Sequence, residues 1–439
     1  MGIKAVKFGG SSLADAGQFK KVKAIMQADP ERLFLVPSAP GKRTYKDEKI
    51  TDMLYTCADR AQKGVPFRDV FDRIAERYVD IAFELAIKFD LVPHLEQVYA
   101  RIAAGEGADY AASRGEYLNG LLVAEYLGFT FVDPAEMVCF DGNGRFDAEL
   151  TQAKMSARLK GMNRVVVPGF YGAMPDGRIK TFSRGGSDIS GALVARAVGA
   201  DVYENWTDVS GFLMADPRIV KDPKTIDVIS YSELRELSYM GATVLHEDSI
   251  FPVRQACIPI NVRNTNLPEH PGTIIVPDDA RQLSSNGIVT GIAGRTGFAI
   301  INVQKDNMNG QLGFGRKFLQ VLEEFGISFE HMPSGIDTLS AVIADKELEG
   351  KRKKVVDELM RALEADSIEI HDNMALIATV GRGMVSTIGT AAKLFTALAR
   401  DGVNVRMIDQ GSSELNIIVG VESDDFGTAV NAIYRAFAQ

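Results

Sequence analysis

The chain has 439 residues, of which 46% are hydrophobic and 24% charged, so its length predicts two or three globular domains. Its net charge of −9 at pH 7, without a long basic run, argues against nucleic-acid binding. Its three cysteines form no CxxC pair, and no apolar run approaches the roughly 20 residues that cross a bilayer. We therefore expect a cytoplasmic protein without disulfides, structural zinc or a membrane anchor.

The first predicted strand leads into a glycine-rich segment. The apolar run at residues 3–6 is followed by Lys7 and then by Gly9 and Gly10, and apolar side chains over residues 19–26 are spaced like one helix face. Backbone N–H groups without neighbouring side chains, close to a helix N-terminus, bind phosphate. The segment predicts a phosphate site, although a strand-to-helix turn without a ligand also fits these residues.

Strand-like and helix-like segments alternate through the first 280 residues or so. We expect short buried strands at residues 33–36, 129–132 and 164–167, and a long helical pattern spans residues 70–89. Such alternation is typical of an α/β protein with a mainly parallel sheet. Asn, Pro, Gly and Ser cluster over residues 264–287, which indicates a domain boundary.

A second glycine-rich segment lies at residues 183–188, after a predicted hairpin turn at residues 175–177. Arg184 has a planar guanidinium that suits bidentate binding of a carboxylate. The two glycines allow close backbone approach, and either Ser187 or Asp188 is a good N-cap for the helix expected next. The pattern predicts a ligand site, and a glycine-rich helix cap with a surface arginine is the alternative.

Polar residues also follow other predicted strands. Thr207 and Asp208 end one strand, and Ser38 follows the strand at residues 33–36. Ligands of open α/β sheets bind at the carboxyl ends of the strands, so these residues are candidates for a site. Glu116, in the first turn of a predicted helix, could hold a ligand ammonium. The alternatives are loop capping for Thr207 and Asp208 and a helix-dipole role for Glu116.

The C-terminal part of the chain contains an internal repeat. An ungapped offset of 76 residues pairs Gly326 with Gly402 and aligns their apolar neighbours. Apolar strands at residues 298–303 and 375–380 precede the two copies, so each copy is expected to form a βαββαβ unit. The repeat indicates a tandem small-molecule sensor, with two purely structural modules as the alternative.

Several catalytic signatures are missing from the sequence. It contains no GxxxxGK[ST] motif, no strand followed by GxGxxG and no GxSxG. The histidine at position 246 lacks the second histidine of HExxH. These absences argue against a Walker-type NTPase, a dinucleotide dehydrogenase, an α/β-hydrolase and a zinc protease of that type.

Together, these segments resemble the aspartokinases of the amino-acid kinase superfamily. The resemblance covers nearly the whole chain and rests on strings in family order: KFGGSS, VPSAPG, RGE, FSRGGSD, WTDVSG, ADPR, GATVLH and PGTII. It implies a three-layer α/β sandwich with a mainly parallel central sheet, the amino-acid kinase fold, followed by two ferredoxin-like βαββαβ ACT domains. The implied catalytic domain covers residues 1–280, and the ACT domains cover 288–366 and 367–439, with the strand at 288–294 open to assignment to the second.

The resemblance implies ATP-dependent phosphorylation of the β-carboxylate of L-aspartate to 4-phospho-L-aspartate, with Mg²⁺ accompanying ATP and no dedicated metal site on the protein. The implied catalytic residues are Lys7, which would neutralise charge on the transferring phosphoryl group, and Asp188. The implied substrate-binding residues are Ser38, Thr51, Glu116, Arg184, Gly185, Gly186 and Ser187. The implied nucleotide-binding residues are Lys7, Phe8, Gly9, Gly10, Ser11, Thr207, Asp208, Asp216 and Arg218.

The ACT pair implies feedback inhibition by an end-product amino acid of the lysine, threonine and methionine pathway, with lysine, alone or together with threonine, as the expected effector. It also implies a homodimer or a higher homo-oligomer. The implied effector-binding residues lie in the first ACT domain: Met308, Gly313, Phe314, Gly315, Ser328, Ser334 and Asp337.

The chain departs from the family pattern at three places. Thr243 stands where Lys or Arg is frequent, Leu213 stands where an aromatic residue is frequent, and residues 42–49 look like an insertion relative to shorter members. Two other interpretations stay open. One is a related kinase that acts on a different carboxylate or a carbamate, and the other is a catalytically silent regulator that binds an amino acid.

Overall fold

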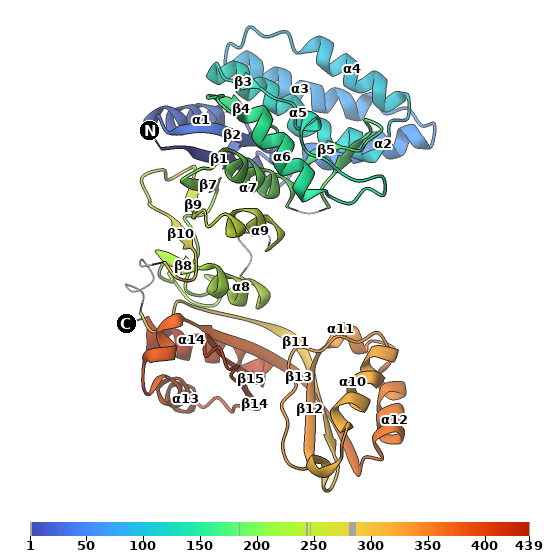
Figure 1. The fold of residues 1–439 in the computed structure, drawn as a ribbon, viewed down its shortest axis with the longest axis vertical. Helices are drawn as coiled ribbons and strands as arrows, with labels where there is room; N and C mark the ends of the chain where they lie inside the picture. Colours follow the sequence, from blue (N-terminus) through green and yellow to red (C-terminus); the bar gives the residue numbers. More distant parts are fainter. Residues whose placement is uncertain (1, 184, 243–244, 246, 281–286, 439) are drawn as a thin grey trace. The chain divides into compact units, whose positions relative to one another are not determined.

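The computed structural model describes residues 2–183, 185–242, 245, 247–280 and 287–438. The chain forms two compact units (Figure 1). The first comprises Met1–Phe212, Thr225–Tyr231 and Thr243–Leu283, and the second comprises Leu213–Lys224, Ser232–Ala242 and Ser284–Gln439. The second unit therefore includes two short segments from within the predicted catalytic domain.

The first unit is built on an eight-stranded sheet. In sheet order its strands are β3 (Thr130–Phe131), β4 (Val165–Val166), β2 (Arg32–Pro37), β1 (Lys4–Phe8), β7 (Val202–Thr207), β9 (Ile260–Asn264), β10 (Thr273–Val276) and β8 (Val228–Ser230). Neighbouring strands are parallel except β9 and β10. Because Ala5, Val6 and Phe8 are fully buried, β1 is covered on both faces, as expected in a parallel sheet between helices.

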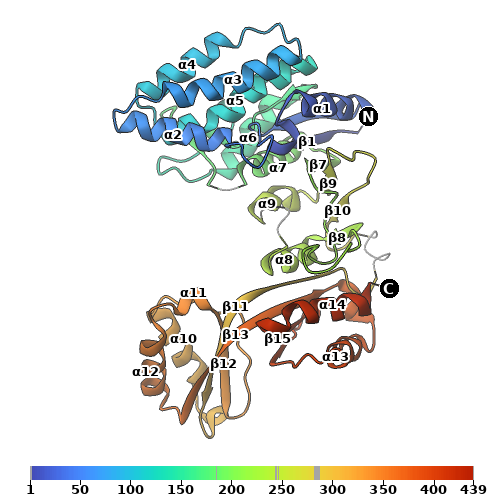
Figure 2. The ribbon, with the colours of Figure 1, turned by 180° about the vertical axis from the view of Figure 1, so that it is seen from behind.

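Helices lie on both sides of this sheet. α1 and α5 lie on one side and α7 on the other, in both views (Figures 1 and 2). This arrangement confirms the predicted three-layer α/β sandwich with a mainly parallel sheet. The helices that begin in the first unit are α1 (Ala16–Ala28), α2 (Ile50–Gln62), α3 (Arg68–Glu84), α4 (Val92–Ala103), α5 (Ala108–Leu127), α6 (Ala148–Leu159), α7 (Gly186–Val198), α8 (Tyr231–Tyr239) and α9 (Glu247–Gln255).

The glycine-rich segment at the end of β1 does not lead directly into an α-helix. A short 3-10 helix, η1 (Gly10–Leu13), intervenes before α1 begins at Ala16. The Asp15 side chain caps α1 by accepting a hydrogen bond from the Gln18 N–H. The helix predicted from the apolar spacing over residues 19–26 is therefore present as α1, and it begins beyond the short 3-10 helix.

The helix predicted over residues 70–89 is shorter than expected. α3 ends at Glu84, and Ala86 has a φ of +51°, which no α-helix accommodates. The Ala86 N–H donates to the Phe83 carbonyl, as at many helix C-termini.

The predicted hairpin turn at residues 175–177 is present between β5 (Tyr171–Ala173) and β6 (Ile179–Thr181).

The second unit contains a five-stranded antiparallel sheet. Its order is β12 (Thr338–Ala344), β11 (Gly291–Gln304), β13 (Ser367–Val380), β15 (Asn416–Glu422) and β14 (Met407–Asp409). The 14-residue strands β11 and β13 pair along their length and run through both copies of the repeat. The two predicted strands at 298–303 and 375–380 are therefore parts of longer strands.

The helices of the second unit show the predicted repeat directly. They are α10 (Phe314–Glu324), α11 (Asp345–Leu348), α12 (Arg352–Leu363), α13 (Thr390–Arg400) and α14 (Phe426–Phe437). The bounds of α10 and α13 differ by the predicted offset, and both helices follow a left-handed glycine, Gly313 and Gly389. The predicted tandem repeat is confirmed, and in the first copy isolated bridges at His331 and Ser334 stand where the second strand of the βαββαβ unit was predicted.

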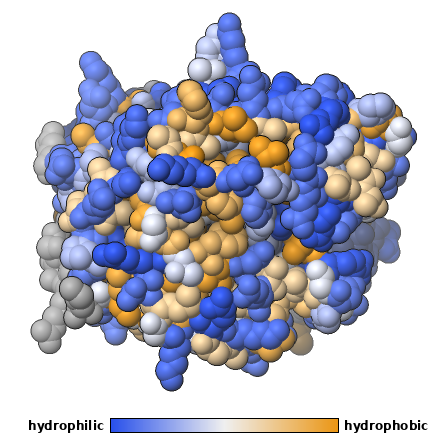
Figure 3. Space-filling view, turned by 90° about the horizontal axis from the view of Figure 1, so that it is seen from above, coloured by the Kyte–Doolittle hydropathy of each residue, from blue (hydrophilic) through white to orange (hydrophobic). Residues whose placement is uncertain are grey.

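The surface and the helices add two further observations. Seen from above the view of Figure 1, hydrophilic side chains surround and interrupt areas of hydrophobic ones (Figure 3). Among the described residues, every helix is too short or too polar to serve as a membrane span.

Candidate active site

Lys7 and Asp188 meet at the centre of the first unit's sheet. Lys7 is 7% exposed, and its Nζ lies 2.6 Å from Oδ1 of Asp188, in the first turn of α7. The Asn205 side chain donates to the same Asp188 oxygen over 2.8 Å. Because Lys7 and Asn205 are register partners on β1 and β7, the sheet itself brings the three side chains together. Asp188 thus fixes the position of the Lys7 ammonium.

The glycine-rich segment after β1 lies at the carboxyl edge of the sheet. The Gly9 N–H donates to the Trp206 carbonyl over 2.9 Å, so this amide is engaged within the sheet. Gly10 packs tightly, since a Cβ atom there would lie 2.9 Å from the Ala39 carbonyl oxygen. The phosphate contacts expected of Phe8, Gly9, Gly10 and Ser11 stay a prediction.

The loop after β2 is held against this glycine segment from several sides. The Ser38 N–H donates to the Phe8 carbonyl over 3.0 Å, and the Gly41 N–H donates to the Gly10 carbonyl over 2.8 Å. From α5, the Asn119 amide donates to the Ser38 carbonyl over 2.6 Å. Residues 38–41 are therefore wedged between the glycine segment and α5.

Glu116 on α5 is a buried carboxyl with spare bonding capacity. It is 6% exposed, and its Oε2 atom has no hydrogen-bond partner among the described residues. Burial raises the pKa of this carboxyl to about 7, although the Ala39 N–H bonds to it and the nearby Arg114 charge favours ionisation. An unpaired acceptor of this kind can hold the ammonium of a ligand.

The neighbouring Arg114 does not neutralise Glu116 by direct pairing. Its guanidinium lies over the rings of Tyr110, Tyr117 and Tyr171, with centroids 4.6–4.9 Å away. Such cation–π contacts stabilise a buried cation without a carboxylate. The Glu116 carboxyl is thus left available to a ligand.

The N-terminus of α7 provides a second glycine-rich edge. Gly185, with a φ of +58°, precedes the helix, which begins at Gly186, so neither Ser187 nor Asp188 is the N-cap predicted from the sequence. A Cβ at Gly186 would lie 2.5 Å from the Phe170 ring, so only glycine fits there. The predicted carboxylate-binding Arg184 lies outside the described residues. The 13-residue α7 directs its partial positive charge toward this edge.

Thr207 and Asp208 lie at the carboxyl end of β7. The Thr207 hydroxyl donates to Oδ1 of Asp208 over 3.2 Å, and Asp208 is exposed. Because β1, β2 and β7 are parallel neighbours, their ends at Phe8, Pro37 and Thr207 lie at one edge of the sheet. The fold therefore brings the predicted residues of β1, β2 and β7 to a common edge.

Three further predicted site residues lie on other segments. Thr51 is in the first turn of α2, which packs against α5 beside Gly115. Asp216 and Arg218 belong to the second unit, where hydrogen bonds from Arg218 lower the pKa of Asp216. The Arg218 side chain is 87% exposed. Their predicted ligand contacts stay predictions.

The predicted effector residues of the first repeat have mixed environments. The side chains of Met308 and Phe314 are buried in the hydrophobic core of the repeat, which does not favour direct contact with a polar ligand. The Asp337 carboxylate accepts a hydrogen bond from the Asn307 N–H over 2.9 Å, so the loops before α10 and before β12 are joined. The remaining predicted positions are half-buried or exposed: Gly313, Gly315, Ser328 and Ser334.

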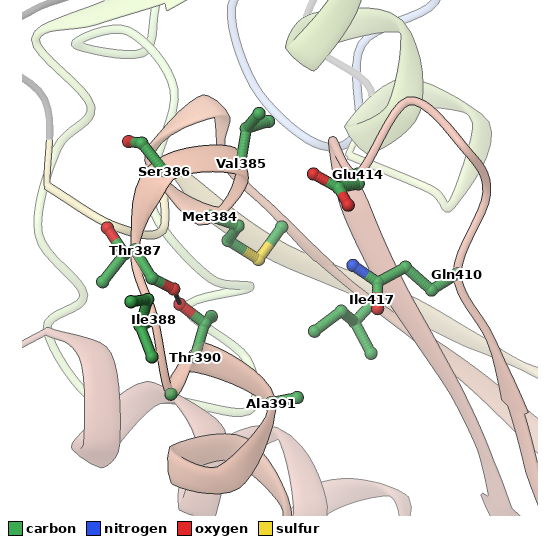
Figure 4. Close-up of a pocket in the computed structure, with 11 residues that line it drawn as sticks. Met384, Val385, Ser386, Thr387, Ile388, Thr390, Ala391, Gln410, Glu414 and Ile417 are labelled. Atoms are coloured by element: carbon green, nitrogen blue, oxygen red, sulfur yellow. Dashed lines mark hydrogen bonds between the residues drawn. The ribbon is translucent and has the colours of Figure 1, made fainter.

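A pocket of about 280 Å³ lies in the second repeat, at the counterpart of these loops (Figure 4). The repeat offset relates its residues Met384 and Gly389 to Met308 and Gly313. Figure 4 shows that one wall comes from the segment leading into α13 and the other from the segments around β14 and β15. It is lined by Met384, Val385, Ser386, Thr387, Ile388, Gly389, Thr390, Ala391, Gln410, Glu414 and Ile417.

Comparison with known proteins identifies the family. The model of the amino acid kinase family matches residues 2–264, and an ACT domain model matches residues 377–437. The chain is 36% identical over 450 residues to Aspartokinase 3 of Bacillus subtilis, covering 99% of this chain and 98% of that protein. The chain belongs to the aspartokinase family.

Solved aspartokinase structures share this fold. The aspartate kinase of Clostridium acetobutylicum, described as an allosteric enzyme, is 55% identical with a TM-score of 0.92, and the match covers all of both chains. Escherichia coli aspartokinase III, in complex with lysine and aspartate in its T-state, is 25% identical with a TM-score of 0.72, again over all of both chains. The resemblance inferred from the sequence motifs is confirmed.

Two residues of this aspartokinase site were missed by the sequence analysis. Asn205 is two residues before Thr207 on β7, and its place opposite Lys7 depends on the parallel register of β1 and β7. Asn119 follows Glu116 by three residues on α5, so both lie on one helix face. The helical spacing of Asn119 is a signal that the sequence already contains.

Proposed function

We propose that this aspartokinase transfers the γ-phosphoryl group of ATP to the β-carboxylate of L-aspartate and produces 4-phospho-L-aspartate and ADP. The observation that carries the proposal is the ion pair of the buried Lys7 with Asp188, which lies at the edge where both glycine-rich segments end. The product is an activated acyl phosphate, which suits the first step of a biosynthetic pathway to lysine, threonine and methionine.

The transfer needs charge stabilisation more than acid–base chemistry. The β-carboxylate of aspartate, with a reference pKa of about 3.9, is ionised at neutral pH and needs no general base. One of its oxygens bonds to the γ-phosphorus while the bond from that phosphorus to the ADP oxygen breaks. Lys7, held by Asp188 and Asn205, stabilises the charge that develops on the phosphoryl oxygens.

The two substrates would use different edges of the site. The α-ammonium of aspartate would bind Oε2 of Glu116, which has no hydrogen-bond partner among the described residues. The carboxylates of aspartate would bind at the start of α7, with Arg184, Ser38 and Thr51 contributing. ATP would bind along residues 7–11 and at Thr207 and Asp208, and the nucleotide contacts of Asp216 and Arg218 stay a separate prediction for the second unit. Mg²⁺ would accompany ATP and neutralise its phosphates, because hard cations prefer phosphate oxygens and water.

The proposed reaction is tested by acceptor specificity. The purified chain is incubated with MgATP and aspartate, glutamate or no acceptor, and hydroxylamine traps any acyl phosphate as a coloured hydroxamate. Hydroxamate that forms only with aspartate supports the proposal. ATP turnover with glutamate, or no turnover with any acceptor, would favour the related kinase or the silent regulator and overturn it.

We further propose feedback inhibition by lysine, alone or together with threonine, through the two repeats of the second unit. The lysine complex of the E. coli relative supports this choice of effector. An inhibition assay with lysine and threonine, separately and combined, tests this proposal, and unchanged activity in all three cases would contradict it.

We also propose that the protein is a homodimer or a higher homo-oligomer and that it is cytoplasmic. The free thiols of Cys57, Cys139 and Cys257 fit a reducing compartment.

A further inference from the structure

Arg77 on α3 is a buried cation without an assigned role. It is 4% exposed, although arginine is almost never buried without partners. Its Nη1 donates to the Gly41 carbonyl over 3.0 Å and makes a longer contact of 3.4 Å with the Ala14 carbonyl. Its Nη2 donates to the Asp47 carboxylate over 2.5 Å. One guanidinium thus joins the segment after η1, the loop after β2 and the segment at residues 42–49.

The partner carboxylate is itself fully engaged. Asp47 accepts hydrogen bonds from the Arg43 N–H over 3.0 Å and from the Arg43 guanidinium over 3.1 Å. Burial opposes its ionisation, but the Arg43 hydrogen bonds and the Arg77 charge lower its pKa to about 2. The Asp47 carboxylate therefore stays ionised at neutral pH.

The Gly41 backbone transmits the position of this pair to the glycine segment. The Gly41 N–H donates to the Gly10 carbonyl over 2.8 Å. A Cβ at Gly41 would lie 2.6 Å from the Gly10 carbonyl carbon and 2.8 Å from the Ser11 nitrogen. Packing this close leaves no room for independent movement, so a shift of Gly41 must move Gly10 and Ser11 as well.

We propose that Arg77 is a positioning residue for ATP, which acts through Gly41 to hold the Gly10–Ser11 backbone in its phosphate-binding geometry. The inference rests on the proposed function, in which residues 7–11 bind the nucleotide phosphates. It also gives a role to residues 42–49, because Asp47 in that segment provides the countercharge that a buried Arg77 requires.

The direct test removes the guanidinium. Since a misplacement of the order of 1 Å remote from the chemistry costs roughly a hundredfold, Arg77→Ala should lower kcat/KM for ATP by about that factor. KM for aspartate at saturating ATP should change little, and the affinity for ADP measured by calorimetry should fall in parallel. Guanidinium ion at millimolar concentration should restore part of the ADP affinity, which a general loss of folding would not allow.

Three further variants keep this test decisive. Arg73→Ala removes an exposed ion pair between the same helix and Glu48 of the same segment, and it should leave the affinities for aspartate and ADP unchanged. If Arg77→Ala does not fold, Asp47→Asn and Gly41→Ala should show the same selective loss for nucleotide. Normal ADP affinity in folded variants, or an equal loss in Arg73→Ala, would overturn the inference. Because ADP binding needs no acceptor, this outcome is separate from the choice of aspartate as substrate.

Discussion

Lys7 in this site is held by two side chains, whereas Glu116 keeps a free acceptor atom among the described residues. Asp188 and Asn205 fix Lys7, whereas the Oε2 atom of Glu116 has no partner among the described residues. This difference between Lys7 and Glu116 matches their proposed roles. A fixed ammonium is preorganised for phosphoryl transfer, while an open acceptor is suited to a ligand that brings its own positive charge.

The raised pKa of Glu116 predicts a pH dependence of aspartate binding. Below a pKa of about 7 the free carboxyl is protonated and cannot pair with the aspartate ammonium. KM for aspartate should therefore rise as pH falls, approaching tenfold per unit well below that pKa. Steady-state kinetics from pH 5.5 to 8.5 measure this, and Glu116→Gln should have a high KM without this pH dependence. A flat profile in the wild-type protein would contradict the assignment.

The same pKa sets the sign of a stability effect. The folded carboxyl binds its proton more tightly than the unfolded one, with an ordinary pKa of 4.5, so its contribution to stability is lost as pH rises from about 4.5 to about 7. Denaturant unfolding of the ligand-free protein should show this decrease, and Glu116→Gln should reduce it.

At the residue scale, the sequence motifs found two side chains that contact each other, and the catalytic roles given to them stay predictions. Lys7 and Asp188 were singled out by their strings, and they pair in the structure. Asn205 and Arg77 were not found, because their roles depend on strand register and on a backbone carbonyl in a distant loop. No periodicity or motif encodes such contacts.

Helices and strands could be predicted from the sequence where their hydrophobic pattern depends only on neighbouring residues. The repeat offset correctly relates α10 to α13 because both copies keep the same glycines and apolar positions. The continuity of β11 was not foreseen, since its exposed middle contains Gly297 with a φ of +91° and a bulge at Phe298 that interrupts the alternating pattern. Tertiary pairing with β13 extends the strand beyond its apolar core.

Close packing at the first residue of α7 predicts that a substitution there destabilises the protein. A methyl group at Gly186 would overlap the Phe170 ring, so Gly186→Ala should destabilise the protein by about 1–3 kcal/mol and displace the helix start. Gly142→Ala is the matched control, because no atom lies within 4 Å of its added Cβ. Urea unfolding measures the stability of both variants. Equal unfolding midpoints for Gly186→Ala and Gly142→Ala would show that α7 accommodates the added methyl group, and would contradict the prediction.

Within the second unit, two segments from the predicted catalytic domain are bonded to the repeats. The Asn431 side chain of α14 donates to the Ile219 carbonyl over 3.1 Å, and the Lys224 N–H donates to the Tyr434 hydroxyl over 2.9 Å. On α8, Glu236 accepts from Asn416 over 2.6 Å. The segment that contains Asp216 and Arg218 is therefore hydrogen-bonded to α14, within the unit that is proposed to bind the effector.

The hydrogen bond from Asn431 to Ile219 predicts that its removal weakens the coupling between effector binding and catalysis. Asn431→Ala should raise the lysine concentration needed for half-inhibition, with a change in coupling free energy of roughly 0.5–2 kcal/mol, while turnover without effector stays normal. Thr428→Ala, an exposed position on the same helix, is the control. Unaltered inhibition in Asn431→Ala would show that this attachment does not carry the signal.

The role of Lys7 is tested most directly by the hydroxamate assay on Lys7→Met, with Lys4→Met on the same strand as control. Loss of a preorganised charge at the phosphoryl group predicts a turnover at least about a hundredfold below wild type for Lys7→Met, whereas Lys4→Met keeps normal turnover. Near-normal hydroxamate formation by a folded Lys7→Met protein would contradict the account.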